Sequence, residues 1–270
     1  MVNDFYISSE YKYINGKNGN VIKKHKISNR IFSFCVAVSV EKGSFFVEIN
    51  NELFNVFEGE TVFVPSFVPH AVGTDEDSVV TYAHFYCSFL NMDVFRFTKK
   101  ACIISRNQQL CNILMQMNDS ALNEGFLGKI LADRAICDVV LTLQSENSLC
   151  VKLDETDAHL YKVLNYINQN ISRGVDTSEV IAENGYKKTN FYKIFTEKMN
   201  MTPHEYIERE RMKLATLMLA EGKKVKDIAT IVGYNDESYF IKKFKKVVGK
   251  TPTQYRKSME ELLYGTEKSR

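Results

Sequence analysis

No apolar run in this 270-residue sequence reaches the ~18 residues that a membrane-spanning helix needs. The first residues, MVNDFYISSEYKY, lack the basic start and the continuous apolar stretch of a secretory signal peptide. We therefore expect a protein of the cytoplasm with no membrane segment. A composition of 44% hydrophobic and 25% charged residues excludes a disordered tail or a fibre, and the length suggests two domains of roughly 100–200 residues each.

The sequence also lacks paired cysteine motifs. None of its six cysteines forms CxxC or another zinc-like spacing, so neither a zinc site nor a disulfide framework is expected. All six lie within the first 150 residues, and we interpret them as small buried apolar residues. A redox-sensing thiol is the alternative, but no sequence feature supports it.

Net charge is nearly absent, at +2 for the whole chain, which alone argues weakly against a nucleic-acid partner. This sum conceals an asymmetry. Residues 1–155 contain 14 Lys and Arg against 18 Asp and Glu, a balance of −4, whereas residues 156–270 contain 21 against 15, a balance of +6. The second half is therefore the candidate for binding an anionic partner.

The first half contains short β-type segments followed by helical ones. Runs rich in Phe, Val and Tyr at 31–40, 43–50, 52–57, 60–65 and 79–89 predict strands of a closed barrel or a sandwich. Residues 105–147 then show helical spacing, which predicts a pair of helices. Their apolar stripe contains Leu127, Leu131, Ala135, Val139 and Leu143 at steps of four.

The stripe has two interpretations, and the pattern favours neither. It packs on the chain's own barrel, or it forms a dimerisation surface. We predict a first domain at 1–150, with the barrel at about 20–98 and the helices at about 105–147. A polar linker follows at 151–157, and a helical second domain covers 158–270.

The second domain contains an internal repeat. A shift of 49 positions aligns Phe191 with Phe240, Phe195 with Phe244, Thr202-Pro203 with Thr251-Pro252, and Tyr206 with Tyr255. Each copy is typical of a helix, a tight turn and a second helix, with Gly185 and Gly233 at the turns because glycine adopts positive φ freely. We predict helix-turn-helix units at about 177–199 and 225–248.

The second helix-turn-helix unit indicates what kind of molecule the domain binds. Its second helix has an apolar side and a cationic side, and residues 241–258 contain seven Lys and Arg but no acidic residue. Such a helix fits the DNA major groove while its lysines neutralise phosphate, so we predict double-stranded DNA. A helix predicted at about 204–221 joins the units. Its 18 residues span about 27 Å, comparable to a DNA turn of ~34 Å, so the units should contact two adjacent major grooves.

These residues resemble a known family. Ile228-Ala229, Val232-Gly233-Tyr234, Ser238-Tyr239-Phe240, Phe244, Gly249, Thr251-Pro252 and Tyr255 closely resemble the signature of AraC/XylS transcription regulators, and the resemblance covers 160–257. It implies that Thr189, Tyr192 and Lys193 of the first unit, and Glu237, Ser238 and Lys242 of the second, read DNA bases. Ile181 departs from the pattern, since the family usually has Ala there. Lys188, Lys243 and Lys246 on the same helices are further candidate DNA contacts.

The first half resembles the family more loosely. Gly59-Glu60-Thr61-Val62-Phe63-Val64-Pro65, followed by Pro69-His70, is similar to the second hairpin of a cupin barrel. Residues 31–49 contain no His, although catalytic cupins bind a metal there through His-x-His and Glu. His70 and His84 remain, with His25 as a remote third. We expect no metal, no cofactor and no catalytic residues.

A barrel without metal ligands is suited to hold a small molecule. The resemblance implies an effector, often a sugar or another metabolite, and contact with RNA polymerase. The candidate effector-binding residues are those expected on inward strand faces: Phe34, Val36, Phe46, Glu48, Phe63, His70, Tyr82 and His84. Arg30 and Lys26 face either an anionic ligand or solvent, and we favour solvent.

The sequence thus predicts an α+β, two-domain protein. The N-terminal domain would be a cupin-like β-barrel with a helical pair, and the C-terminal domain would be all-α with two helix-turn-helix units joined by a long helix. We expect a sequence-specific DNA-binding transcription regulator and not an enzyme. It would be an activator controlled by a small-molecule effector and a homodimer through 105–147. The alternatives are a cupin metalloenzyme with a DNA-binding appendage, and a regulator whose first domain senses a protein partner.

Overall fold

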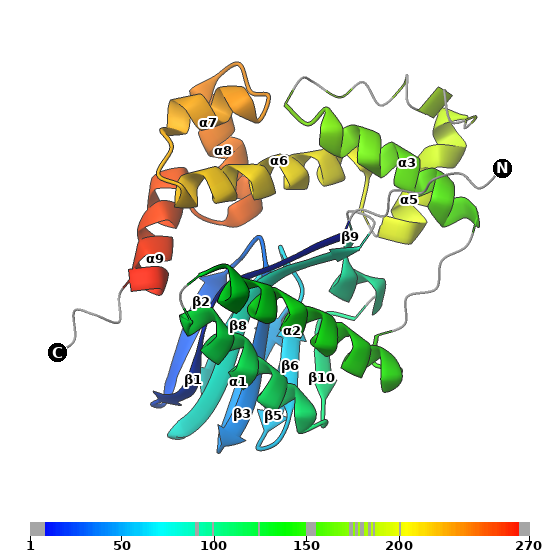
Figure 1. Ribbon diagram of the computed structural model, residues 1–270. Coiled ribbons are helices and arrows are strands. Elements are labelled where there is room, and N and C mark those ends of the chain that lie inside the picture. Colours follow the sequence, from blue (N-terminus) through cyan, green and yellow to red (C-terminus); the bar gives the residue numbers. More distant parts are fainter. Residues whose placement is uncertain are drawn as a thin grey trace. The chain divides into compact units, whose positions relative to one another are not determined.

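The chain forms two compact units, Met1–Lys152 and Leu153–Arg270, in the computed structural model (Figure 1). The structure describes residues 9–264 except 90–91, 99, 124, 150–154, 173–174, 176–177, 179–180, 183–184, 186 and 200. The predicted linker, 151–157, lies partly outside these residues. Its last part, 155–157, belongs to a helix, which corrects the expectation of an irregular segment there.

Two antiparallel sheets make up the first unit. The larger sheet has the order β1-β8-β3-β6-β10, with β9 paired to β8, and the smaller has the order β2-β7-β4-β5. The strands are β1 (Ser9–Ile22), β2 (His25–Arg30), β3 (Cys35–Lys42), β4 (Ser44–Ile49), β5 (Glu52–Phe57), β6 (Thr61–Val64), β7 (His70–Thr74), β8 (Ser78–Phe89), β9 (Met92–Asp93) and β10 (Ile103–Ser105).

The barrel expected at about 20–98 begins earlier than predicted. Strand β1 pairs with β8 from Ser9 to Ile22 and contains two glycines, Gly16 and Gly19, and many polar residues. Such a composition does not produce an apolar run, and for that reason the sequence pattern did not reveal the strand. Its register shifts between Tyr13 and Asn15 and again between Lys17 and Asn20, which breaks the polar and apolar alternation further.

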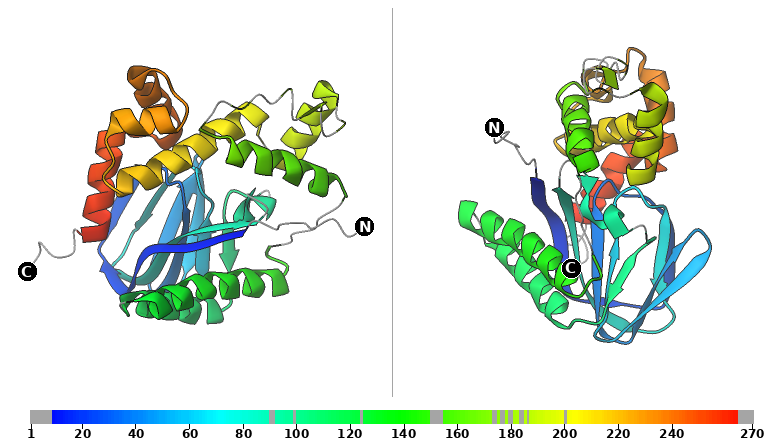
Figure 2. Two further views of the ribbon diagram at one scale, coloured as in Figure 1. Left: turned by 45° about the horizontal axis from the view of Figure 1, so that its top comes forward. Right: turned by 90° about the vertical axis from the view of Figure 1, so that its right-hand side faces the viewer.

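Helices α1 (Gln109–Leu122) and α2 (Phe126–Ser145) cover one face of the larger sheet (Figures 1 and 2). A short 3-10 helix, η1 (Val94–Thr98), packs there too. The shared core joins alternate strand residues to the inner faces of both helices, and it includes Ala37, Phe63, Phe85, Cys87, Phe95, Leu110, Leu114, Ala135, Val139 and Leu143. The helical pair therefore packs on the larger sheet of its own domain, as the first of the two interpretations of the apolar stripe expected.

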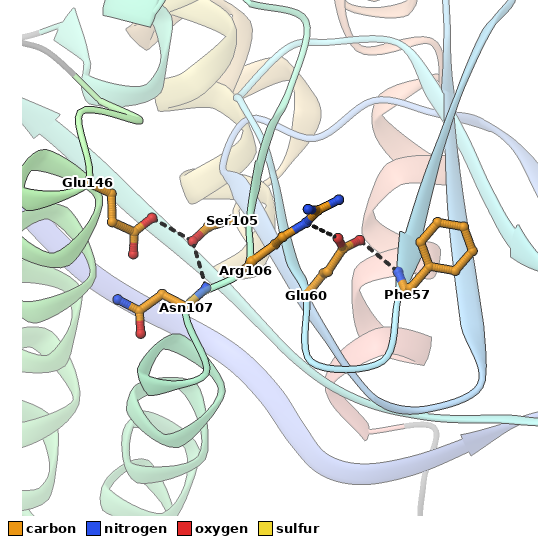
Figure 3. A network of polar contacts seen from close by, with 6 residues as sticks. All are labelled: Phe57, Glu60, Ser105, Arg106, Asn107 and Glu146. Carbon is orange, nitrogen blue, oxygen red and sulfur yellow. Dashed lines mark hydrogen bonds and ion pairs between the residues drawn. The ribbon is translucent and has the colours of Figure 1, made fainter.

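A polar network fastens the ends of these helices to the sheets (Figure 3). Ser105 donates a 2.6 Å hydrogen bond to Glu146 just after α2 and accepts one from the Asn107 N–H before α1. The carboxylate of Glu60, in the β5–β6 turn, accepts hydrogen bonds from Arg106 Nε at 2.8 Å and from the Phe57 N–H at 2.9 Å. One short segment thus ties both helices to a hairpin of strands.

The second unit is helical in the residues described. Its helices are α3 (Glu155–Gln169), α5 (Lys188–Met199), α6 (Pro203–Ala220), α7 (Val225–Ile231), α8 (Glu237–Val248) and α9 (Pro252–Tyr264). Helix α6 begins at a capping box, in which Thr202 and Glu205 satisfy each other's backbone N–H groups, and it ends before Gly222, whose φ is +79°. Most of the first helix expected in the first helix-turn-helix unit lies outside the described residues.

Candidate DNA interface and effector site

Both helix-turn-helix units hold their second helix with the same arrangement of rings. Phe195 of α5 meets Tyr206 edge to face, with ring centres 5.7 Å apart and planes at 70°. Phe244 of α8 meets Tyr255 in the same way, at 5.8 Å and 78°. All four side chains are buried. The repeat in the sequence is therefore a repeat in three dimensions, and α5 and α8 bury equivalent faces.

The helix starts are repeated too. Thr202 and Glu205 form a capping box before α6, and Thr251 and Gln254 exchange the same two backbone bonds before α9, at 3.3 Å and 3.0 Å. Asp236, the expected N-cap of α8, accepts a 2.6 Å hydrogen bond from the Tyr239 N–H. Asp236 thus fixes the start of α8, and the caps at Thr202 and Thr251 fix the starts of the helices that follow α5 and α8.

Most of the predicted DNA contacts lie on the exposed sides of these helices. The exposed candidates are Lys188, Thr189 and Lys193 on α5 and Glu237, Ser238, Lys242 and Lys246 on α8. Thr189 and Ser238 are equivalent under the 49-residue shift, as are Lys193 and Lys242. Both helices therefore present a hydroxyl group and, one turn further on, an ammonium group. Lys188 and Glu237 are equivalent as well, but with opposite charge.

Lys243, another of the predicted DNA contacts, is engaged within the second unit. Its ammonium group forms an ion pair with Glu208 of α6 and lies 5.6 Å from the Tyr239 ring centre. The hydrogen bond with Glu208 also raises the pKa of Lys243. A run of lysines in the sequence does not show which of them meets an acidic side chain from another helix.

Tyr192 is partly buried, and its hydroxyl lies 3.3 Å from Nε2 of His204 at the start of α6. Its phenol is therefore engaged within the unit in this structure. Ile181, where the family usually has Ala, is buried at 2% exposure, so the larger side chain is accommodated in the core.

The turn of the second helix-turn-helix unit packs against α6. Gly233 has a φ of +84°, as the sequence pattern predicted for a glycine turn. A Cβ atom there would lie 3.0 Å from a guanidinium nitrogen of Arg211, and Arg211 itself lies over the Tyr234 ring at 5.4 Å. The glycine thus permits both the backbone conformation and the close approach of α6.

The inner face of the larger sheet, which faces away from α1 and α2, carries four of the predicted effector-binding residues. Val36 pairs with His84 across β3 and β8, and Tyr82 lies two residues before His84, so these side chains share one face. The Phe34 ring lies 5.2 Å from that of His84. His70, from the smaller sheet, reaches the same place, since its ring lies 6.0 Å from Phe32, whose ring is 5.7 Å from His84.

Three predicted effector-binding residues point elsewhere. Phe63 stacks on Phe95 in the core between the larger sheet and its helices. Phe46 and Glu48 alternate with the buried Phe45, Val47 and Ile49, so they lie on the outer face of the smaller sheet, where Glu48 forms an ion pair with Lys26. The error has one physical cause: a slip of one residue in a predicted strand reverses the face of every side chain.

Arg30 and Phe32 also belong to this cluster, although the sequence favoured solvent for Arg30 and gave no signal for Phe32. The guanidinium carbon of Arg30 lies 4.8 Å from the centre of the Phe32 ring, beside the two histidines. Arg30 ends β2 opposite His70, so the strand pairing carries its side chain toward this cluster and not outward to solvent. A lone basic residue at a predicted strand end gives no signal of this in the sequence.

No three His, Cys, Asp or Glu side chains come close enough to hold a metal ion within the part of the chain that the structure describes. No helix there is long and apolar enough to cross a membrane. The five described cysteines, Cys35, Cys87, Cys102, Cys111 and Cys137, are free, and the first three are buried. Burial raises the pKa of Cys35 and Cys87, which keeps both thiols protonated and unreactive.

Known proteins are similar to this chain in sequence and in fold. Residues 180–258 match a family described as a helix-turn-helix domain. The chain is 25% identical over 242 residues to the uncharacterized HTH-type transcriptional regulator YdeC of Bacillus subtilis, and the match covers 82% of each protein. It is 26% identical over 155 residues to the probable transcriptional regulator LumQ of Photobacterium leiognathi, which covers 56% of this chain and 60% of LumQ.

The fold is shared with a solved structure. The crystal structure of ToxT from Vibrio cholerae bound to an unsaturated fatty acid aligns over 98% of both chains, with a TM-score of 0.60 and 15% identity. The two-domain α+β architecture, with antiparallel sheets followed by a helical domain, is thereby confirmed.

The paired second helices and their matched supports define the class: a DNA-binding transcription regulator with two helix-turn-helix units. Within that class, the residues between 228 and 255 resemble the signature of the AraC/XylS family. The relatives named here are regulators, in agreement with the expectation that this protein is not an enzyme.

Proposed function

We propose that residues 158–270 bind two adjacent major grooves of double-stranded DNA and that residues 1–150 sense a small molecule that controls this binding. The protein would act in the cytoplasm, as an activator that contacts RNA polymerase. The observation that carries the proposal is the pairing of exposed side chains at equivalent places on α5 and α8: Thr189 with Ser238, and Lys193 with Lys242.

This pairing has a consequence for the DNA sequence. A hydroxyl group followed one turn later by an ammonium group can contact a similar set of base edges and phosphates in each groove. Lys188 favours a base with acceptors, such as guanine, whereas the equivalent Glu237 favours the amino group of cytosine. We therefore propose a site built from two related but unequal half-sites in the same orientation.

The effector site is proposed at the cluster between the two sheets. Five of the predicted residues, Phe34, Val36, His70, Tyr82 and His84, lie on inner faces there, and aromatic rings adjoin polar groups. Rings with a few polar groups are typical of small-molecule sites. The ToxT structure was solved with a fatty acid, which shows that a protein of this fold can bind an organic acid.

A homodimer through α2 is proposed from its outer face. Phe126, Leu127, Leu131 and Leu141 are exposed there, at 82%, 68%, 38% and 66%. Positions 127, 131, 134, 138 and 141 follow steps of four and three, the spacing of a coiled-coil seam. Arg134 and Asp138 occupy the middle of the seam with opposite charges, so two antiparallel copies are complementary to each other.

The DNA proposal is tested with the intact protein on a site selected from random-sequence DNA. We expect affinity to fall as salt rises, and Lys193→Ala and Lys242→Ala each to lower the slope of log affinity against log salt by about 1. Lys129→Ala is the matched control, because this exposed lysine lies on α2. A slope unchanged by both test variants, or lowered equally by the control, would contradict the assignment.

A further inference from the structure

The cluster between the sheets contains a positive charge that has no acidic partner among the described residues. Arg30 lies over the Phe32 ring and is partly buried. No carboxylate lies within ion-pair distance of its guanidinium, and no hydrogen bond from it is formed, among the side chains that the structure describes. Removal from water lowers the pKa of Arg30 to about 10, so it remains a cation at neutral pH. A guanidinium in this position is suited to bind a carboxylate through two parallel hydrogen bonds.

The second feature is a ring nitrogen of His70 to which no group in the described part of the chain donates a hydrogen bond. Nδ1 of His70 lies 2.8 Å from the Val68 carbonyl oxygen, which only accepts hydrogen bonds, so Nδ1 carries the hydrogen atom. The other ring nitrogen, Nε2, therefore has a lone pair when the ring is neutral. It is buried and has no hydrogen-bond partner within the described residues, and the whole side chain is 5% exposed. Such an atom is costly unless a bound group donates to it.

The neutral state of His70 is built into its surroundings. Burial, and then the nearby charge of Arg30, hold the pKa of His70 at about 4. His84 is held neutral in the same way, with a pKa of about 3, while its Nδ1 lies 2.7 Å from Oδ1 of Asn15. Near neutral pH the cluster thus offers one cation and an imidazole lone pair, both against the Phe32 ring.

A ligand that satisfies both groups must accept from Arg30 and donate to His70. We propose that the effector is an organic hydroxy acid whose carboxylate binds Arg30 and whose hydroxyl group donates a hydrogen bond to Nε2 of His70. A plain carboxylate leaves the lone pair of His70 unsatisfied, and a plain alcohol leaves Arg30 unpaired. A phosphate ester, with nearly two negative charges, exceeds the single positive charge present, because Lys26 is paired with Glu48 on the outer face.

This inference rests on the proposed control of DNA binding by an effector in this cluster. The probes are three matched sets of hydroxy acid, acid and alcohol: lactate, propionate and 1,2-propanediol; gluconate, hexanoate and glucitol; salicylate, benzoate and phenol. Binding to the intact protein is measured by calorimetry, and DNA affinity is measured with and without each probe. In at least one set the hydroxy acid should bind about tenfold or more tighter than both analogues, as expected when a buried polar group is left unsatisfied.

Two variants test separately the roles of Arg30 and His70 in binding the hydroxy acid. Arg30→Gln should reduce binding of the hydroxy acid to the level of the matched alcohol, and His70→Phe should reduce it to the level of the plain acid while leaving binding of the plain acid unchanged. Circular dichroism and the thermal midpoint establish that each variant is folded.

Different results overturn different claims. If no hydroxy acid binds, or if an analogue without the hydroxyl or without the carboxylate binds as tightly, the inference is wrong. If in that case a neutral sugar or glucose 6-phosphate binds and changes the DNA affinity, effector control itself stands. If hydroxy acids bind with this preference and the DNA affinity is unchanged, the ligand class is correct and the proposed control is wrong.

Discussion

Lys243 on α8 and Glu208 on α6 form an ion pair that joins the recognition helix of the second unit to the long helix between the units. Both side chains are about a quarter exposed, at 26% and 27%, so the pair is only partly screened by water. The neighbouring Lys242 is exposed and is not paired with an acidic side chain of the described residues. Two adjacent lysines in one cationic run therefore have different surroundings.

This difference predicts opposite results for two adjacent substitutions. Lys243→Ala should lower the free energy of unfolding by about 1 kcal/mol and leave the salt slope of DNA binding unchanged. Lys242→Ala should lower the salt slope by about 1 with little change in stability. Denaturant unfolding and binding titrations at several salt concentrations measure both. An equal loss of slope in the two variants would show that Lys243 also contacts phosphate.

The outer face of α2 predicts the oligomeric state. The double variant Leu127→Ser/Leu131→Ser should convert a dimer into a monomer, because it removes two of the exposed apolar side chains of the seam while the buried face of α2 is kept. Analytical ultracentrifugation measures the mass, and Val21→Ser, at an exposed position on β1, is the control. A monomeric wild-type protein, or a variant that remains dimeric, would refute the seam.

The two buried histidines predict a loss of stability in acid. Their pKa values in the folded protein, about 4 for His70 and about 3 for His84, lie below the ordinary value of 6.5. Between pH 6.5 and 4 the unfolded chain therefore binds more protons than the folded one, so stability falls as pH falls. Each histidine should contribute about 1.4 kcal/mol per pH unit in this range, and the contribution is fully present above pH 7.

Histidine NMR and denaturant unfolding test this expectation together. The imidazole signals of His70 and His84 should not titrate above pH 5, and His70→Asn/His84→Asn should flatten the pH dependence of stability between pH 6.5 and 5. Asn keeps a donor near the Nδ1 position, so the bonds to Val68 and Asn15 are largely preserved. Titration of either ring near pH 6.5 would mean that the cluster is hydrated.

The network in Figure 3 predicts a stability effect far from either site. Glu60→Ala should lower the stability of the first unit by about 1–3 kcal/mol, because it removes the acceptor of the Phe57 N–H and of Arg106 Nε from a buried position. Glu58→Ala, at an exposed position in the same turn, is the matched control and should change stability by less than about 0.5 kcal/mol. Equal effects would assign the loss to the turn and not to the network.

The two domains differ in how clearly the sequence encodes their structure. The helical domain could be predicted in detail because its Thr caps and buried aromatic residues recur at an offset of 49 positions, and its turn glycines, Gly185 and Gly233, recur at 48. Strand β1 was missed because its polar residues and register shifts leave no apolar pattern. The apolar stripe of α2 divides: Ala135, Val139 and Leu143 are buried on the sheet, whereas Leu127 and Leu131 are exposed.

The residues of the effector site could be predicted only in part from the sequence. Strand register decides which face a side chain occupies, and neither Phe63 nor Phe46 carries that information locally. Arg30 and His70 are 40 residues apart in sequence and meet only because β2 pairs with β7. Their chemistry depends on burial and on missing partners, which a sequence does not display.

The central claim is that α5 and α8 enter two adjacent grooves of one DNA site. Hydroxyl-radical footprinting of the intact protein on its selected site tests this most directly. We expect two protected patches on one face of the duplex, about 10 base pairs apart. Lys193→Ala should weaken protection in one patch and Lys242→Ala in the other. A single protected patch, or loss of the same patch in both variants, would contradict the account.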